Sequence, residues 1–199
     1  MIFRLINSLK SKELLGVVGP KETVELFAKN WCKEKQSEIV HRMAQGVYEL
    51  KKVKRPKSLE GNLVKYEPKY REVLERFIKG FMKEVFPYED RSNEIQEVCA
   101  RHAKNETAHF LEVEGRVLAM AVNNRESKNA ATISLVYTPP ESRGKGYGSA
   151  VTALLSEKML KQGKEKCNLF TDLSNPTSNS IYQKIGYQKI GESLHVRFS

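Results

Sequence analysis

Three glycines alternate with other residues in the segment Arg143-Gly144-Lys145-Gly146-Tyr147-Gly148. A run of β-forming residues ends at Pro139 and Pro140 just before this segment, and apolar residues at helical spacing follow it. A strand, a glycine-rich turn and a helix in this order leave backbone N–H groups free at the helix N-terminus, where the helix dipole favours negative charge. Arg143 and Lys145 add positive charge at the same place. The segment therefore predicts a phosphate-binding turn.

The glycine spacing excludes two familiar kinds of phosphate motif. A nucleotide P-loop needs G-x-x-x-x-G-K-[ST], whereas Gly148 is followed here by Ser149-Ala150. A dinucleotide fingerprint needs G-x-G-x-x-G, and Gly148 follows Gly146 too early for that pattern. The pattern R-x-x-G-x-G does fit, at Arg143, Gly146 and Gly148. Taken alone, the turn leaves an ordinary glycine-rich strand-to-helix connection as the alternative.

A second segment further along the chain narrows the choice of phosphate ligand. Residues 166–173 have the pattern of a strand, and Asn175-Pro176 then opens a short helix that carries Tyr182 and ends at Gly186-Tyr187. Together with the glycine turn, this order of elements resembles the GCN5-related N-acetyltransferase (GNAT) family over about residues 63–199. In that family the R-x-x-G-x-G turn binds the pyrophosphate of acetyl-CoA.

The resemblance implies a fold of the α/β (α+β) class. It implies a mixed, mostly antiparallel central sheet flanked by helices, with splayed strands at the acetyl-CoA site. Hydrophobic periodicity supports such an alternation independently, and Pro68 and Pro87 bound the longest helical pattern. The tail from 187 to 199 is expected to form one or two closing strands. Strands are predicted at 63–66, 107–112, 116–123 and 131–137, and helices at 70–86, after 92, and at 148–162.

The resemblance also implies a role for particular residues. Backbone groups of Val136, Tyr137 and Thr138 would pair with the pantetheine and the acetyl oxygen. Asn175 and Asn179 would contact the coenzyme, and Tyr182 would bind it and donate a proton to its sulfur. A Tyr pKa of about 10 suits that transfer, although a core aromatic is the other interpretation of Tyr182. The amides that would hold the pyrophosphate are those of Arg143, Gly144, Lys145, Gly146, Tyr147, Gly148 and Ser149.

The sequence defines the general base least well. Residues 132–137 contain no carboxylate, and Phe170 stands where one branch of the family has a Glu. Asp172 lies two residues further on, and therefore on the same face of a regular strand. Its alternative role is a turn or cap residue before Asn175. Glu84, on the polar side of the long helix, is a second candidate, and a water chain to solvent is a third.

The N-terminal residues 1–60 lie outside the expected catalytic domain, which covers residues 61–199. A helical face of Val24, Phe27, Ala28 and Trp31 and a strand at 45–50 predict a helix-strand appendage that packs on the catalytic domain. It resembles the N-terminal extension of some larger bacterial relatives. Nothing in it has the character of a catalytic residue.

Charge and composition restrict the class of protein further. The net charge of +10 suits a nucleic acid, an acidic membrane surface or a polyanionic coenzyme. The basic run at 51–57 is typical of a solvated linker, and the aromatic-basic interleaving of a nucleic-acid binder is missing. No apolar run approaches the roughly 20 residues that cross a bilayer, and the N-terminus does not have the pattern of a secretory signal. The three cysteines suit neither a disulfide framework nor a zinc site.

These observations predict a cytoplasmic N-acetyltransferase that uses acetyl-CoA as co-substrate and needs no metal. The acetyl group would pass to a primary amine of a small molecule or peptide, by direct attack in a ternary complex. Because no base is evident, a non-catalytic acyl-CoA-binding or sensing domain is the alternative function. The expected partners are acetyl-CoA and an amine acceptor, with no nucleic acid and no membrane, and the protein is expected to be a monomer or a homodimer.

Overall fold

The computed structural model describes residues 2–56, 61–86 and 91–199. Pro87 and Lys57, which bear on the predicted helix end and basic run, lie outside these residues. The described strands form a mixed sheet in the order β1-β8-β2-β7-β6-β5-β4-β3. The chain divides into two compact units: Met1–Tyr48, Phe170–Asn179 and Lys189–Ser199 form the first, and Glu49–Leu169 and Ser180–Gln188 form the second.

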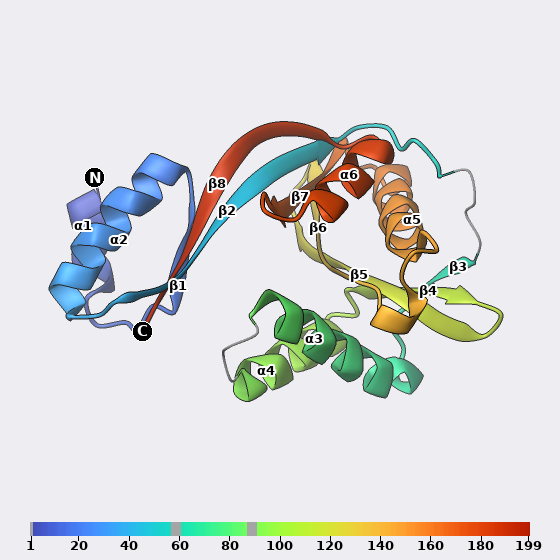
Figure 1. Cartoon of the computed structure of the whole chain (residues 1–199), viewed down its shortest axis with the longest axis horizontal. Coiled ribbons are helices and arrows are strands. Elements are labelled where there is room, and N and C mark those ends of the chain that lie inside the picture. Colours follow the sequence, from blue (N-terminus) through green and yellow to red (C-terminus); the bar gives the residue numbers. More distant parts are fainter. Residues whose placement is uncertain (1, 57–60, 87–90) are drawn as a thin grey trace. The chain divides into compact units, whose positions relative to one another are not determined.

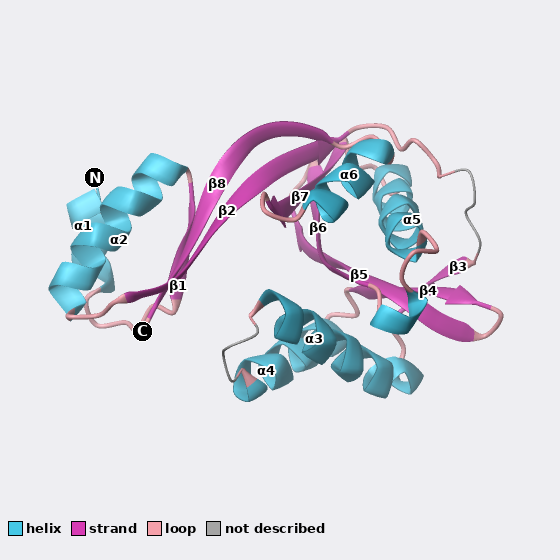
Figure 2. Cartoon of the chain, in the orientation of Figure 1, coloured by secondary structure: helices cyan, strands magenta, loops and turns pink. Residues whose placement is uncertain are grey.

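The first unit contains the N-terminal elements and the last strand of the chain. β1 (Gly16–Gly19) pairs antiparallel with β8 (Gln188–Phe198), and Figure 2 shows β8 beside the long strand β2 (Ile39–Leu50). The predicted apolar face of α2 (Lys21–Lys35) is buried, and its Trp31 packs against Phe198 of β8. The short helix α1 (Ile2–Leu9) also contributes to this core through Ile6.

The second unit contains the strands and helices around the glycine turn (Figure 1). Three antiparallel pairings join β3 (Asn62–Lys65), β4 (Ala108–Val113), β5 (Arg116–Glu126) and β6 (Ala130–Tyr137). β6 then runs parallel to the first residues of β7 (Lys166–Asp172). The helices of this unit are α3 (Arg71–Val85), α4 (Ser92–Lys104), α5 (Tyr147–Lys161) and the part of α6 (Pro176–Lys184) from Ser180 onward.

Helices cover both faces of the sheet in the second unit. Phe110, Met120 and Val122 of the strands pack in one core with the apolar stripe of α3 and with α4. The intervening positions point the other way, because successive strand residues alternate between faces. Accordingly, Asn123 contacts Met159 of α5 on the opposite face. The mixed, mostly antiparallel sheet flanked by helices is thus confirmed.

Each compact unit combines segments that are far apart in the sequence, and the division into an appendage 1–60 and a catalytic domain 61–199 stays a prediction. The first unit includes Lys189–Ser199 because β8 returns to pair with β1. Pairing of strands from opposite ends of a chain leaves no local signal in either segment. The predicted single or double closing strand is one continuous strand, β8, from Gln188 to Phe198.

Candidate functional site

The glycine turn is shaped by two residues with left-handed backbone conformations. Gly144 has φ 79° and Gly146 has φ 82°, whereas a Cβ at either position would meet nothing within 4 Å. Backbone conformation rather than crowding therefore favours glycine here. Gly146 lies at the N-cap of α5, and the first N–H of the helix to bond within it is that of Ala150, to the Gly146 carbonyl at 3.0 Å.

The geometry of this helix start favours an anion. The N–H groups of Tyr147, Gly148 and Ser149 precede the first intrahelical bond, so they point out of the helix N-terminus. The helix dipole adds partial positive charge at the same end, and the exposed Lys145 stands within the turn. Gly148 also lets Thr138 come close, since a Cβ there would lie 3.2 Å from Thr138 Oγ1. The structure thus brings the predicted turn residues together at one helix end.

Arg143 is held beside the turn by three neighbours. Its Nε donates to the Thr138 carbonyl at 2.9 Å, and its guanidinium forms an ion pair with the Glu84 carboxylate of α3. The guanidinium carbon also lies 5.9 Å from the ring centre of Tyr137. Glu84, the second candidate base, is therefore engaged with a cation in this structure.

β6 has an irregularity where the backbone was predicted to bind the pantetheine. Tyr137 lies opposite Met120 and Ser134 opposite Val122, so β6 contains one residue more than β5 between these pairs. Leu135 has φ 47° at this bulge, which is unusual for a non-glycine residue. Pairing with β7 ends at Ile133 opposite Leu169, so the residues from Ser134 onward lie beyond that register. The residues of β7 that follow Leu169 belong to the first unit, so the splaying of β6 stays a prediction.

Tyr137 is fixed by close packing against α3. Its ring lies edge-on to Phe77, with 5.6 Å between ring centres. Gly80 makes this approach possible, because a Cβ there would lie 2.6 Å from Cζ of Tyr137. Burial raises the pKa of Tyr137, with the Glu84 charge as the next cause. The backbone of Tyr137 is predicted to contact the coenzyme, and its side chain thus also anchors β6 to α3.

Tyr182 is buried on α6 and keeps its proton over a wide pH range. Burial raises its pKa to about 12, and the side chain is 9 % exposed. Its ring lies edge-on to Tyr187, with 6.1 Å between ring centres and 68° between planes. A neutral phenol can donate a proton or a hydrogen bond, so the state of Tyr182 suits the predicted role.

The remaining predicted residues belong to the first unit and build the turn before α6. Asp172 Oδ1 accepts from the Ser174 N–H at 2.8 Å, and Asn175 Oδ1 accepts from the Ser178 N–H at 3.0 Å. Asn179 Nδ2 donates to the carbonyls of Asp172 and Asn175, and its Oδ1 accepts from Tyr48 at 2.9 Å. The observed contacts of Asp172 are those of a turn residue. Coenzyme contacts of both asparagines stay a prediction.

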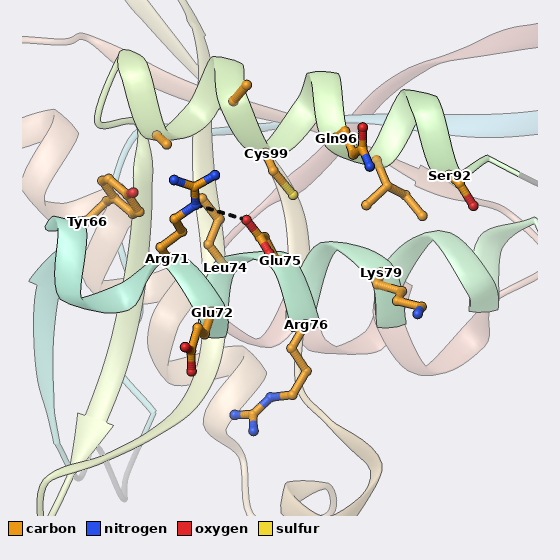
Figure 3. Close-up of a pocket in the computed structure, with 13 residues that line it drawn as sticks. Tyr66, Arg71, Glu72, Leu74, Glu75, Arg76, Lys79, Ser92, Gln96 and Cys99 are labelled. Atoms are coloured by element: carbon orange, nitrogen blue, oxygen red, sulfur yellow. Dashed lines mark hydrogen bonds and ion pairs between the residues drawn. The ribbon is translucent and has the colours of Figure 1, made fainter.

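The outer groove between α3 and α4 does not coincide with the predicted site (Figure 3). This hollow has a volume of about 860 Å³ and is lined from the two helices by charged residues, such as Arg71 and Glu75, and by small ones, such as Cys99. Arg71 Nε donates to the Glu75 carboxylate at 3.1 Å along α3. None of its described lining residues comes from the glycine turn or from β6.

Two absences concern metal ligands and membrane-spanning helices. Over residues 2–56, 61–86 and 91–199, no group of three or more His, Cys, Asp or Glu side chains could hold a metal ion. In the same described part of the chain, no helix combines the length and apolar character needed to cross a membrane.

Several residues of the site were not found by sequence reasoning. Leu135 has the positive φ of the bulge, Gly80 admits Tyr137, and Thr152 and Ser156 are fully buried hydroxyl residues on α5. The one available signal was the spacing of Gly148, Thr152 and Ser156, because small or polar residues every four positions form a stripe along a helix.

Comparison with known proteins gives one partial family match and a set of structures with a similar fold. Residues 113–196 match the model of the FR47-like protein family. None of the curated proteins matches the sequence. Chains of solved structures do match, 179 in number. They include an acetyltransferase from the GNAT family of Colwellia psychrerythraea, with a TM-score of 0.63 and 13% identity, over 98% of this chain and 72% of that one.

Two further structures extend the comparison. A GCN5-related N-acetyltransferase from Kribbella flavida has a TM-score of 0.57 and 15% identity, over 88% of this chain and 62% of that one. A structure from Clostridium acetobutylicum, described as a predicted acetyltransferase with acetyl-CoA, has a TM-score of 0.50 and 19% identity, over 64% of this chain and 90% of that one. At these identities the likeness establishes a shared fold.

Proposed function

We propose that the chain is an N-acetyltransferase that uses acetyl-CoA, because residues 113–196 match the FR47-like family model and the fold is shared with structures of GNAT acetyltransferases. The acceptor is a primary amine of a small molecule or peptide. The observation that carries the proposal is the joint geometry of the second unit. A bulged β6 leads into a glycine turn with free N–H groups at the start of α5, and a buried neutral tyrosine lies on α6.

The residues of the second unit match the chemical parts of acetyl-CoA. The free N–H groups of Tyr147, Gly148 and Ser149 and the cations Arg143 and Lys145 suit its pyrophosphate. The backbone of Val136, Tyr137 and Thr138 lies beyond the pairing with β7, and can therefore accept and donate hydrogen bonds to the amide-containing pantetheine arm and the acetyl oxygen.

The transfer follows from these positions. A neutral amine attacks the carbonyl carbon of the thioester, a C–N bond forms, and the C–S bond breaks. Hydrogen bonding to the β6 backbone stabilises the oxyanion that develops on the acetyl oxygen. The sulfur leaves as a thiolate and takes a proton from the hydroxyl of Tyr182, which regains one from solvent. An acid in hydrogen-bond reach of a leaving group typically contributes about 100-fold or more in rate.

The proton lost by the amine passes to water rather than to a fixed carboxylate in this proposal. Asp172 is engaged in its turn and Glu84 in its ion pair with Arg143. The same observation favours the second candidate function, a non-catalytic acyl-CoA-binding or sensing domain. That function predicts coenzyme binding without transfer to any amine.

A thiol-release assay with a panel of primary amines tests the proposal. The expected result is release of coenzyme A that depends on one class of amine and falls at least about tenfold in Tyr182→Phe. Tyr70→Phe is the matched control, because Tyr70 is also a buried tyrosine, and its hydroxyl bonds Glu112 at 3.1 Å away from the glycine turn. Coenzyme binding without release on any amine would support the sensing function instead.

A further inference from the structure

A row of buried hydroxyl groups runs along α5 from the glycine turn. Thr152 Oγ1 donates to the Gly148 carbonyl at 2.8 Å, and Ser156 Oγ donates to the Thr152 carbonyl at 2.7 Å. Ser156 Oγ also lies 2.9 Å from the hydroxyl of Tyr187. Because Ser156 has a single proton and gives it to Thr152, Tyr187 must be the donor in the last bond. Every hydroxyl of the row therefore donates toward the glycine turn: Tyr187 to the Ser156 hydroxyl, Ser156 to the Thr152 carbonyl, and Thr152 to the Gly148 carbonyl.

Hydroxyls are an unexpected choice in this place. The other buried residues of α5 are alanine, valine, leucine and methionine, and Thr152 and Ser156 are both 0 % exposed. A buried hydroxyl costs free energy unless it is hydrogen-bonded, and serine and threonine bonding to the preceding turn slightly weaken a helix. An apolar pair would fill the same space without that cost. The row is thus better explained by the geometry that it imposes than by stability.

Tyr187, at the end of the row away from the glycine turn, contacts Tyr182, the proposed proton donor. Tyr187 packs edge-on against the ring of Tyr182, and its N–H donates to the Tyr182 carbonyl at 3.0 Å. The backbone between them is also held, since the Lys54 N–H donates to the Ile185 carbonyl at 2.9 Å. A Cβ on Gly186 would lie only 2.8 Å from the Lys52 carbonyl. The end of α6 therefore has little freedom to move.

We propose that Tyr187, through its hydrogen bond to Ser156, is a positioning residue that fixes the Tyr182 hydroxyl relative to the glycine turn. This inference rests on the proposed acetyl transfer. The turn sets where the phosphates lie, and Tyr182 must reach the sulfur at the other end of the same coenzyme. The row couples these two points through Gly148, Thr152, Ser156 and Tyr187. Displacement of a reacting group by about 1 Å can cost about 100-fold in rate, so a residue that holds Tyr182 in place affects the rate of transfer.

The test compares Tyr187→Phe, Ser156→Ala and the double variant with wild type. Tyr187→Phe removes one oxygen atom and leaves Ser156 free to donate to Thr152, so no donor is left unpaired and the fold is retained. We expect kcat to fall about tenfold while KM for acetyl-CoA changes less than about twofold. The double variant should be no slower than the slower single variant, because the two side chains act as one unit.

A second readout does not depend on any acceptor amine. Calorimetry with coenzyme A and with desulfo-coenzyme A measures how much the sulfur contributes to binding. Wild type should prefer coenzyme A, and this preference should shrink in both Tyr182→Phe and Tyr187→Phe. It should persist in Tyr70→Phe, which removes a buried hydrogen bond away from the row.

The outcomes separate the inference from the function on which it rests. If wild type transfers acetyl groups but Tyr187→Phe keeps wild-type kcat and the preference for coenzyme A, the positioning role is wrong and the function stands. The same holds if the effects of the two single variants multiply in the double variant. If wild type binds no coenzyme, the proposed function and this inference fail together.

Discussion

Two buried histidines should make the protein lose stability in mild acid. His102 of α4 and His109 of β4 are 2 % and 3 % exposed. The pKa of each falls from 6.5 to about 4, first because of burial and then because of a neighbouring cation, Arg101 and Lys158 respectively. Their contacts agree with neutral rings. His109 Nδ1 donates to the Thr107 carbonyl at 3.1 Å, so its Nε2 accepts from Lys158 at 3.0 Å.

The direction and size of the effect follow from these pKa values. The unfolded chain takes up protons as the pH falls through 6.5, whereas the folded protein resists until about pH 4. Stability is therefore complete above the unfolded pKa and declines as the pH falls between the two values. Protonation of each histidine should lower the free energy of unfolding by about 2 kcal/mol between about pH 7 and pH 5. For each histidine the loss reaches about 3 kcal/mol once the pH is below both pKa values. Both rings contact Thr107, so the two losses need not add.

Urea denaturation at about pH 7, 6 and 5 measures this loss. The variants His102→Asn and His109→Gln keep a polar group in place and should each flatten part of the decline. Carboxylates with lowered pKa, such as Glu49 beside Lys166, act below their ordinary pKa of 4.5 and so outside this window. A free energy of unfolding that stays constant from about pH 7 to 5, or a decline that both variants leave unchanged, would refute the reasoning.

Three substitutions test the site itself. Gly80→Ala would press a methyl group into the ring of Tyr137. We expect about 1–3 kcal/mol of destabilisation and weaker coenzyme binding by calorimetry. Gly191→Ala is the control, because its added Cβ would meet nothing within 4 Å. Glu84→Gln releases Arg143 from its ion pair and should tighten coenzyme binding a few-fold while turnover persists; loss of turnover would instead make Glu84 the base. Gly146→Ala forces a side chain to φ 82°, and should cost about 1–2 kcal/mol of stability or coenzyme affinity in melting and titration experiments; an unaltered variant would show that this conformation is not needed.

The regular elements of the fold were accessible from local patterns in the sequence. The stripe of apolar residues in α3 and the breaks at Pro68 and Pro139 predict their elements because burial follows helical and strand periods. Gly144 and Gly146 likewise signal positive φ by their residue type. The eight-residue α1 was missed, since so short a helix depends on packing against α2 rather than on its own pattern.

Other parts of the site depend on contacts that no local pattern encodes. The bulge at Leu135 arises from the register between β5 and β6, and residues 130–137 have uniform strand character without any mark of it. Resemblance assigns Asn175 and Asn179 to the coenzyme, but only the structure shows that their side chains also hold the turn before α6. The engagement of Glu84 with Arg143 joins residues 59 positions apart.

Calorimetric titration of the whole chain with acetyl-CoA tests the central claim most directly. Saturable binding at one site is expected, and it should weaken when Arg143→Gln removes the charge beside the glycine turn. Lys128→Gln is a suitable control, since it removes an equal charge from the exposed turn between β5 and β6. Absence of measurable heat at about millimolar acetyl-CoA, an affinity near the lower limit for specific ligands, would contradict the account.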